Sequence, residues 1–562
     1  MRQSGDSAKR LLALINRSHA SCGKEQESER KIPPVSRVQN LVGDTGASAG
    51  SSSAKRRKTG KKVEVPPLPR PGGAALASSG VRKTLRKQGP VREPGVHEWQ
   101  GQRPDPARAT HLLLNPSVQC EAFTQRPDAD KAKTAQFAEP WSPLSELLRL
   151  KYASRLRSLL VRLCRSYGRE PPLLAFERWQ CRRKLEEQKH RSSSSGVAND
   201  TRWEPLLPSI DTIDEGLVQD LVRGKLSKAQ AQRVATEIAC TSARLARKLA
   251  EHEREQKTSG TVDVVDDEVT IQARGNDLTS TVVVALGHRK PYLQISLQHY
   301  RKLQELHRLW LTAYSVADSD NGSIPSLGRE DSVFKRHLWC LLARYEGLRG
   351  HGYQAALPGK AFDVLLDELD VSGECFASPL NTRYCGFCSA FPDVDGFFGS
   401  QGSFFNFAPS SGSFEVNPPF VPELMLYAVE HMEHLLRQAV GALSFVVIVP
   451  QWKSVPAWKR LQHSKWKRHG VEISKDSHRY MDGAQHQRAV LHRPSSFHTS
   501  VVFLQNDLGA RRWPVNGATI QKFQAALQSV ASEDHGVGDI AAYEKENKKG
   551  SRKLTKPRLE RP

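Results

Sequence analysis

Residues 413–449 decide the fold of this chain, and they read SFEVNPPFVPELMLYAVEHMEHLLRQAVGALSFVVIV. Residues 413–416 form a short strand candidate, and the apolar positions of 421–440 recur at the spacing of one helix face. The continuous apolar run 443–449 is typical of a strand that is buried on both faces of a parallel sheet. A strand, a helix and a strand in this order predict an α/β fold with a doubly wound sheet.

The same α/β texture extends on both sides of this stretch, over residues 330–530. The apolar spacing predicts helices over 333–345 and 360–369. Short apolar segments predict further strands over 371–376 and 499–504. The α/β domain is therefore expected to contain several strands besides the two that define it.

The rest of the chain divides into parts of different composition. Residues 140–325 carry leucines at three- and four-residue spacing and are predicted to form a mainly helical domain. Residues 1–135 are rich in Ser, Gly, Pro, Lys and Arg, so a disordered basic tail is expected there. Residues 532–562 form a second, Lys-rich tail with the same expectation.

The overall charge favours a polyanionic partner. The 562 residues carry a formal net charge of +23, and Lys and Arg side chains displace the counterions that condense on phosphates. A soluble protein with basic tails is the alternative. No apolar run approaches the roughly 20 residues that span a bilayer, and the N-terminus lacks the apolar core of a signal peptide. No membrane partner is therefore expected.

The nine cysteines are scattered and odd in number, which argues against a disulfide framework and for a reducing compartment. The closest pair is Cys385 and Cys388, and no second pair follows at the spacing of a zinc site. No metal is therefore predicted, and these thiols are interpreted as structural.

Asn417-Pro418-Pro419-Phe420 carries the chemistry, because it follows a strand at the sheet edge where open α/β sheets bind ligands. The exocyclic amine of adenine is a poor nucleophile, and a pocket that accepts its N–H protons orients the nitrogen toward a methyl donor. The Asn417 side chain and the Pro418 backbone each offer a carbonyl acceptor. Phe420 offers a flat face for base stacking. These three residues are the catalytic candidates, and an ordinary Asn-Pro turn is the alternative.

The segment after the 443–449 strand interleaves tryptophans with basic side chains. Such a pattern suits a strand of RNA, whose phosphates meet the charges and whose bases stack on the indoles. A surface loop anchored by its tryptophans is the alternative. The RNA-binding candidates are Lys453, Trp458, Lys459, Arg460, Trp466, Lys467 and Arg468.

Several ordered blocks of sequence resemble the cap-specific adenosine methyltransferase family, also called the phosphorylated CTD-interacting factor family. The resemblance implies a Rossmann-like methyltransferase core preceded by a helical domain, and S-adenosylmethionine as the methyl donor. It also implies that the methyl acceptor is the adenosine next to the cap of capped RNA. The blocks are 374–381, 388–400, 407–409, 411–420, 478–480, 483, 485–486 and 503–507, with weaker similarity at 176–179 and 205–208.

The resemblance also suggests where the cofactor binds. Residues 374–381 end the first strand of the domain and would form the cofactor loop, with Glu374, Phe376, Ser378 and Asn381 as candidates. This loop is not rich in glycine, unlike the usual loop at this position. Asp393 and Asp395 could accept hydrogen bonds from ribose hydroxyls, and residues 392–396 are equally a good turn.

Three further expectations concern partners and alternatives. No pair of tryptophans at the spacing of a WW module occurs before residue 140, so recruitment to the polymerase C-terminal tail loses its support. The basic cluster 55–62 (KRRKTGKK) suggests a nuclear location and leaves a cytoplasmic one open. The alternative functions are adenine methylation of other RNA or DNA, glutamine methylation in protein, and a non-catalytic RNA-binding scaffold.

Overall fold

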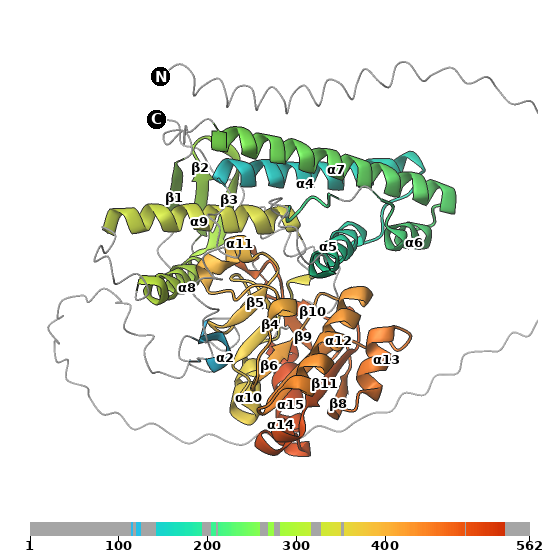
Figure 1. Ribbon diagram of the computed structural model, residues 1–562, viewed down its shortest axis with the longest axis vertical. Coiled ribbons are helices and arrows are strands. Elements are labelled where there is room, and N and C mark those ends of the chain that lie inside the picture. The colour runs from blue at the N-terminus through green and yellow to red at the C-terminus, as the bar shows by residue number, and fades with distance from the viewer. Residues whose placement is uncertain are drawn as a thin grey trace, which may run out of the picture. The chain divides into compact units, whose positions relative to one another are not determined.

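The computed structural model describes residues 114–115, 118, 120–124, 142–193, 204–209, 212–258, 268–274, 281–315, 327–349, 353–488 and 490–533 (Figure 1). The basic cluster 55–62 and nearly all of the two predicted tails lie outside these residues. Within the described residues, no helix is long and apolar enough to cross a membrane.

A six-stranded mixed sheet forms the centre of the α/β part, in the order β5-β4-β6-β7-β11-β8. The strands β5, β4, β6 and β7 pair in parallel. Strand β11 is antiparallel to its neighbours β7 and β8. The strand bounds are β4 Gly373–Ala377, β5 Phe387–Ser389, β6 Gly412–Val416, β7 Leu443–Pro450, β8 Lys467–Ile473 and β11 Thr499–Gln505.

Helices cover both faces of this sheet because its central strands are apolar on both sides. All eight residues of β7 are buried, as the continuous apolar run predicted. Val446 and Ile448 pack on one face with α10 (Gly359–Leu369) and α15 (Gly517–Glu533). Val447 and Val449 pack on the other face with α12 (Pro422–Gln438) and α13 (Pro456–His463). The sheet therefore has the helix-on-both-faces layering of an α/β fold.

Smaller elements complete this part of the chain. The strands β9 (Arg479–Met481) and β10 (His492–Pro494) form a two-stranded antiparallel sheet. The short helices α11 (Pro392–Asp395) and α14 (Asp507–Arg512) follow β5 and β11. The strands and helices predicted for residues 333–504 are confirmed, with boundaries that differ by a few residues, except that the helix of 333–345 begins earlier.

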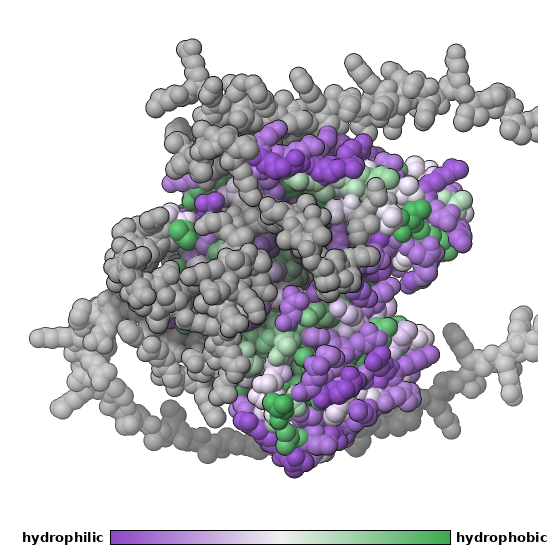
Figure 2. Space-filling model, in the orientation of Figure 1, coloured by the Kyte–Doolittle hydropathy of each residue, from purple (hydrophilic) through white to green (hydrophobic). Residues whose placement is uncertain are grey.

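The part before the sheet is helical, with one exception. The helix α4 (Pro143–Ser166) packs against α7 (Lys228–Thr258) and α9 (Leu327–Leu348). The remaining helices are α5 (Ala175–Ser193), α6 (Glu215–Arg223) and α8 (Leu297–Ser315). The sequence did not predict the three-stranded antiparallel sheet formed by β1 (Val269–Arg274), β2 (Thr281–Leu286) and β3 (Arg289–Ser296). Figure 2 shows hydrophilic residues gathered over α7 and over α12 and α13.

A short piece of the predicted N-terminal tail belongs to the folded core. Helix α2 (Glu121–Thr124) brings Phe123 against Phe407, with ring centroids 4.6 Å apart, and against Phe414 at 5.9 Å. Gly373 and Gly386 lie so close to the Phe123 ring that a Cβ atom at either position would clash with it. Residues 120–124 are therefore packed, which differs from the expectation of a disordered tail for all of 1–135.

Candidate active site

The candidate site lies at the carboxyl edge of the sheet, between β4 and β6. The chain leaves β4 toward β5 on one side and leaves β6 toward β7 on the other. Such a reversal of strand order opens a crevice outside the carboxyl ends of the strands, where α/β sheets bind their ligands. Ser378 follows the end of β4, and Asn417 follows the end of β6. The sequence prediction that Asn417 lies at a carboxyl strand end is confirmed.

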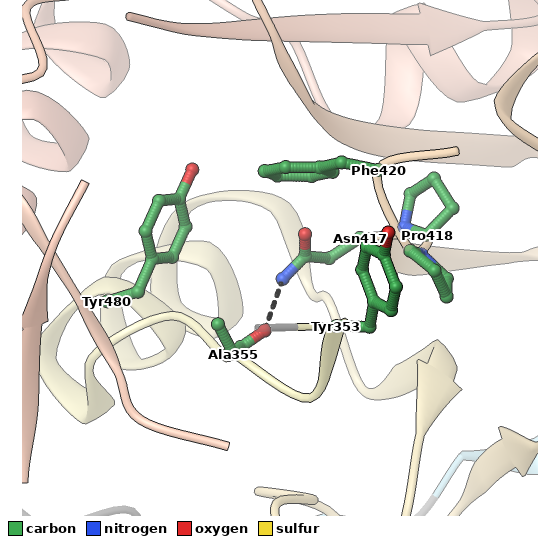
Figure 3. A pocket seen from close by; sticks show the side chains of 7 residues that line it. Tyr353, Ala355, Asn417, Pro418, Phe420 and Tyr480 are labelled. Carbon is green, nitrogen blue, oxygen red and sulfur yellow. Dashed lines mark hydrogen bonds between the residues drawn. The ribbon is translucent and has the colours of Figure 1, made fainter. Parts of the chain in front are cut away.

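Asn417 is held in one orientation by a neighbouring segment. Its Nδ2 donates a hydrogen bond of 3.1 Å to the backbone carbonyl of Ala355 (Figure 3). Because this carbonyl can only accept, the hydrogen bond fixes which end of the amide is nitrogen. The Asn417 Oδ1 acceptor is then directed toward Phe420 and Tyr480.

A pocket surrounds this acceptor, and aromatic rings form much of its wall (Figure 3). The Phe420 ring lies 6.5 Å from the Tyr480 ring, centroid to centroid, at an interplanar angle of 74°. The Tyr480 hydroxyl and the Thr499 hydroxyl share a hydrogen bond of 2.7 Å, which fixes the tyrosine ring. The pocket is lined by Tyr353, Ala355, Asn417, Pro418, Pro419, Phe420 and Tyr480.

The loop after β4 is tied to the same neighbouring segment. Asn381 Oδ1 accepts hydrogen bonds from the Ser378 backbone N–H at 2.7 Å and from the Ser378 hydroxyl at 2.9 Å. Asn381 Nδ2 donates to the Gln354 carbonyl at 2.9 Å. Residues 354–355 therefore receive one asparagine amide from the end of β4 and one from the end of β6, and they bridge the two strands.

Glu374 of β4 stabilises this loop through hydrogen bonds. Its Oε1 accepts from the Thr382 hydroxyl at 2.6 Å and from the backbone N–H of Arg383 at 2.6 Å. Lys302 of α8 donates to the Thr382 carbonyl at 2.6 Å. Burial raises the pKa of Glu374, and burial lowers the pKa of Lys302 to about 7. The Glu374 carboxylate is buried and hydrogen-bonded to the loop, so its role is to stabilise the loop conformation.

Asp393 and Asp395 lie beyond β5 at the same edge, but they differ in exposure. Both Asp393 oxygens accept from Arg344, at 3.1 and 2.8 Å, and a fifth of this side chain is exposed. Asp395 is fully buried and accepts from the Tyr345 hydroxyl at 2.9 Å. Burial raises the pKa of Asp395 to about 7. Asp393 is therefore the accessible carboxylate of the two.

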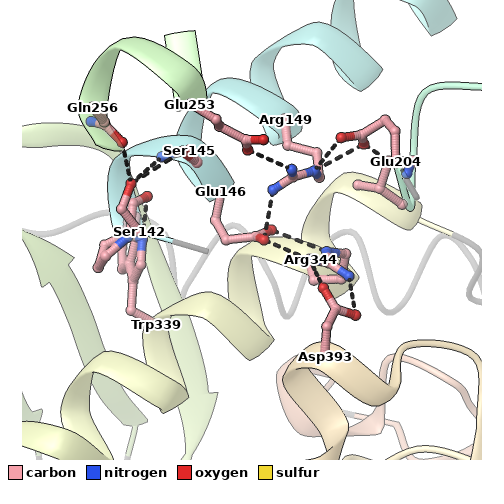
Figure 4. A network of polar contacts seen from close by, with 12 residues as sticks. Ser142, Ser145, Glu146, Arg149, Glu204, Glu253, Gln256, Trp339, Arg344 and Asp393 are labelled. Atoms are coloured by element: carbon pink, nitrogen blue, oxygen red, sulfur yellow. Dashed lines mark hydrogen bonds and ion pairs between the residues drawn. The ribbon is translucent and has the colours of Figure 1, made fainter. Parts of the chain in front are cut away.

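A buried network of ion pairs holds the Asp393 carboxylate in place (Figure 4). Arg344 of α9 also donates to Glu146 of α4, at 2.6 and 3.0 Å. Glu146 accepts from Arg149 at 2.7 Å, and Arg149 donates in turn to Glu204 at 2.9 Å. Arg149, Glu146 and Arg344 are all fully buried. The helical part of the chain is thereby connected to the Asp393 carboxylate through hydrogen-bonded ions.

The remaining cofactor candidate, Phe376, packs away from the pocket. Its ring lies 5.2 Å from Phe404 and 5.9 Å from Phe405, within the core on the α12 face of the sheet. The neighbouring thiols of Cys385 and Cys388 have pKa values that are raised by burial. No cluster of metal-binding side chains occurs among the described residues.

The predicted RNA-binding residues divide between two edges of the sheet. Lys453 follows β7 and lies at the same edge as Asn417. Strand β8 runs parallel to β7, because both are antiparallel to β11, so Lys467 and Arg468 start it at the opposite edge. Trp466 directly precedes them. These three residues are therefore not brought to the pocket.

The charges on α13 are partly neutralised. Arg460 is paired with Glu430 and Glu433 of α12, each at 2.8 Å. Trp458 donates its indole N–H to the Ser500 hydroxyl at 3.0 Å and is fixed against the sheet. Lys453 and Lys459 remain exposed to solvent. Among the predicted RNA-binding residues between β7 and β8, the exposed residues are these two lysines and the paired Arg460.

Comparisons with known proteins give one family model and two named relatives. The family model described as "Phosphorylated CTD interacting factor 1 WW domain" matches residues 303–483. The mRNA (2'-O-methyladenosine-N(6)-)-methyltransferases of Homo sapiens and Mus musculus are each 39% identical to this chain, over 269 and 267 residues. The matches cover 46% and 45% of this chain and 36% and 35% of those proteins. The chain therefore matches about a third of the length of these curated relatives.

These matches confirm the resemblance to the cap-specific adenosine methyltransferase family. The matched residues 303–483 include α9, α10, α12 and the strands β4 to β9. They form most of the sheet that carries the candidate site, although the family description names a WW domain. The region before residue 140, where a WW module was sought, lies almost entirely outside the described residues.

Sequence reasoning missed three residues of the pocket wall, Tyr353, Ala355 and Tyr480. Tyr480 was part of the block 478–480 that carried the family resemblance, so that block was its signal. Tyr353 stands just before the bridging segment, and nothing in the sequence around it points to a site. All three positions depend on contacts between segments that are far apart along the chain.

Proposed function

We propose that this chain is an S-adenosylmethionine-dependent methyltransferase that modifies the exocyclic amine of adenosine at the first transcribed nucleotide of capped RNA. The observation that carries the proposal is the Asn417 acceptor, held by Ala355 and directed into a pocket walled by Phe420 and Tyr480. The relatives at 39% identity are named for methylation of the same nitrogen in mRNA, which supports this choice of substrate.

The pocket residues fit an adenine base. Asn417 Oδ1 and the Pro418 carbonyl are both acceptors, and they match the two N–H groups of the exocyclic amine. Pro418 and Pro419 lack backbone N–H groups, so they offer no competing donors beside the amine. Phe420 provides an aromatic face, and stacking on such a face contributes about 1–3 kcal/mol per base. These residues orient the nitrogen lone pair, and positioning of this kind supplies most of the catalysis.

The residues at the carboxyl strand ends also fit the methyl donor. We assign Asp393 to the ribose hydroxyls, because its carboxylate is partly exposed at the carboxyl edge of the sheet and carboxylate oxygens accept from hydroxyls. We assign Ser378 and the loop that Glu374 and Asn381 shape to the rest of the cofactor. When bound, S-adenosylmethionine supplies the electrophilic methyl group. The six-stranded sheet is then the Rossmann-like core that the family resemblance implies.

The direct test is methyl transfer from labelled donor to matched short RNAs. One RNA starts with capped adenosine, one with capped guanosine and one with uncapped adenosine, and a DNA duplex with adenine serves as the fourth acceptor. Transfer to capped adenosine alone is the expected result. Transfer to uncapped RNA or DNA as well would keep the adenine chemistry and remove the cap from the proposal.

Two results would overturn the proposal. No transfer together with cofactor binding would favour a protein substrate. Failure to bind S-adenosylhomocysteine would favour a non-catalytic scaffold, although the complete Asn417 to Phe420 turn and its held acceptor support an active site. Nuclear import through residues 55–62 remains a proposal of its own, tested by the location of a variant with that cluster neutralised.

A further inference from the structure

A row of aromatic rings leads from the pocket to solvent. The ring centroids of Phe420 and Trp452 are 6.4 Å apart, and those of Trp452 and Phe497 are 5.0 Å apart. Trp452 follows β7, and Phe497 stands two residues before β11, so both lie at the carboxyl edge that carries Asn417. The three rings therefore form a continuous path whose inner end is the wall of the candidate active site.

The outer end of this row is exposed. Phe497 is 41% exposed, the largest exposed fraction of any phenylalanine among the described residues. Aromatic rings bury large apolar areas on contact, and a ring exposed beside a pocket offers such an area to a ligand. A ligand that covers Phe497 would recover this apolar area.

The two outer rings are held in place before any ligand arrives. The Gln451 backbone N–H donates to the His498 carbonyl at 2.8 Å and ties the two segments together. The Ser495 hydroxyl donates to the Phe497 carbonyl at 2.7 Å and closes a turn around the phenylalanine. A preorganised surface loses little conformational entropy when it binds. Trp452 and Phe497 thus resemble a fixed platform more than a flexible loop.

The charge beside the platform is suited to a phosphate backbone. Lys453 directly follows Trp452, and its side chain is 64% exposed. Lys475 is exposed, and its backbone N–H donates to His498 at 3.3 Å, one residue from Phe497. Lysines beside exposed aromatic rings are the combination that binds single-stranded nucleic acid. Glu472, 3.9 Å from Lys453, is the nearest opposing charge to that lysine.

We propose that Phe497, supported by the Trp452 ring at an interplanar angle of 86°, forms a stacking platform for the nucleobase that adjoins the target adenosine. The inference rests on the proposed function, because Phe420 marks the place of the target base. The ligand of the platform is the flat face of a neighbouring base, which is either the cap guanine or the base of the second nucleotide. Through this platform, the affinity of the enzyme for RNA depends on the base beside the adenosine that it methylates.

The test uses the full-length chain with Phe497→Ala, Phe497→Tyr and a control, Leu508→Ala. Leu508 is 42% exposed and lies at the opposite edge of the sheet. With capped RNA, we expect Phe497→Ala to raise KM about 5- to 100-fold, the range that loss of one stacked base predicts. The kcat value stays within about twofold, since the catalytic contacts remain. Phe497→Tyr keeps the aromatic face and restores KM, and Leu508→Ala leaves it unchanged.

Two further substrates identify the base. If the Phe497→Ala effect disappears with RNA that has an abasic second nucleotide, the platform holds the second base. Uncapped RNA is not expected to be methylated, so its affinity is measured by fluorescence anisotropy. If the Phe497→Ala effect on affinity disappears with uncapped RNA, the platform holds the cap guanine. An unchanged KM for Phe497→Ala, or an effect that persists with both substrates, overturns the proposal.

RNA binding separates this inference from the proposed function. Fluorescence anisotropy with a labelled capped RNA is measured alongside transfer. If wild type transfers no methyl group but Phe497→Ala still weakens RNA binding at least fivefold, the platform stands and the proposed function fails. Equal RNA affinity of the variant and wild type in that case overturns the platform too. Melting temperatures report on folding, and the exposed position of Phe497 predicts little change.

Discussion

The Asn417 amide donates to the Ala355 carbonyl at 3.1 Å, and this single bond leaves the Asn417 carbonyl oxygen to face the pocket. Ala355 is joined to Gln354, which accepts the amide of Asn381 at 2.9 Å. The two asparagines follow neighbouring parallel strands, so the bridging segment 354–355 sets the distance between the cofactor loop and the target-base pocket.

Removal of the second asparagine should loosen this bridge. Asn381→Ala leaves the Ser378 backbone N–H and the Gln354 carbonyl without their partner, at a cost of about 1–3 kcal/mol in unfolding free energy. We also expect weaker binding of S-adenosylhomocysteine, because the cofactor loop loses its shape. Urea unfolding and calorimetric titration measure the two effects. Gln521→Ala, at an exposed position on α15, is the control that should change neither.

Phe420 should contribute to RNA affinity more than to cofactor affinity. Phe420→Ala removes the stacking face, which predicts a loss of about 1–3 kcal/mol in RNA binding. Phe420→Tyr keeps the ring and should retain most of the affinity. Steady-state kinetics with capped RNA, together with S-adenosylhomocysteine titration, would check this. An equal loss of both affinities would show that Phe420 only supports the fold.

The buried ion network should be important for stability. Arg344→Met leaves Glu146 and Asp393 without their shared cation, and breaking a buried pair in this way costs about 3–5 kcal/mol. Arg308→Ala removes an exposed pair with Glu305, which is expected to cost less than about 1 kcal/mol. Urea unfolding compares the two variants. A similar small effect for both would contradict a structural role for the network.

Asp395 predicts a pH dependence of stability. Burial raises its pKa to about 7 in the folded protein, against 3.8 for an ordinary aspartate, although hydrogen bonds from Ser389 and Tyr345 oppose the shift. The folded state therefore binds this proton more tightly than the unfolded chain does. The stability from this group is complete below about pH 4 and is lost as the pH rises through 7.

The variant Asp395→Asn cannot titrate, so it should lack this loss. Relative to wild type, its unfolding free energy should rise by up to about 4 kcal/mol between pH 4 and pH 8. Chemical denaturation at several pH values gives the comparison. The exposed Asp476→Asn is the control and should follow wild type at every pH. Parallel curves for Asp395→Asn and wild type would refute a raised pKa.

The sequence predicted the sheet well where apolar residues form long local patterns. The run of β7 and the amphipathic face of α12 are local signals, and both elements are confirmed. The strands β1 to β3 were missed because short strands in a helical setting lack a distinctive period. Phe123 was missed because its packing against Phe407 joins segments that are far apart along the chain.

The candidate site shows the same difference between local patterns, which the sequence reveals, and long-range contacts, which it does not. Asn417 could be placed at a strand end from local pattern alone, and the family resemblance pointed to the acidic residues after β5. The sequence could not show that Arg344 forms an ion pair with Asp393 or that Glu374 accepts hydrogen bonds from the loop backbone. These contacts depend on the packing of distant helices. It also could not show that β8 starts at the far edge, since strand order decides where Lys467 and Arg468 lie.

The most direct test of the central claim is single-turnover methyl transfer by Asn417→Ala on capped adenosine RNA. RNA and S-adenosylhomocysteine affinities are measured on the same preparation. We predict that the rate falls at least about 100-fold, the size expected when a positioned acceptor is lost, while both affinities stay within a few-fold of wild type. A rate equal to that of wild type would contradict the assignment of Asn417 as the residue that orients the adenine amine.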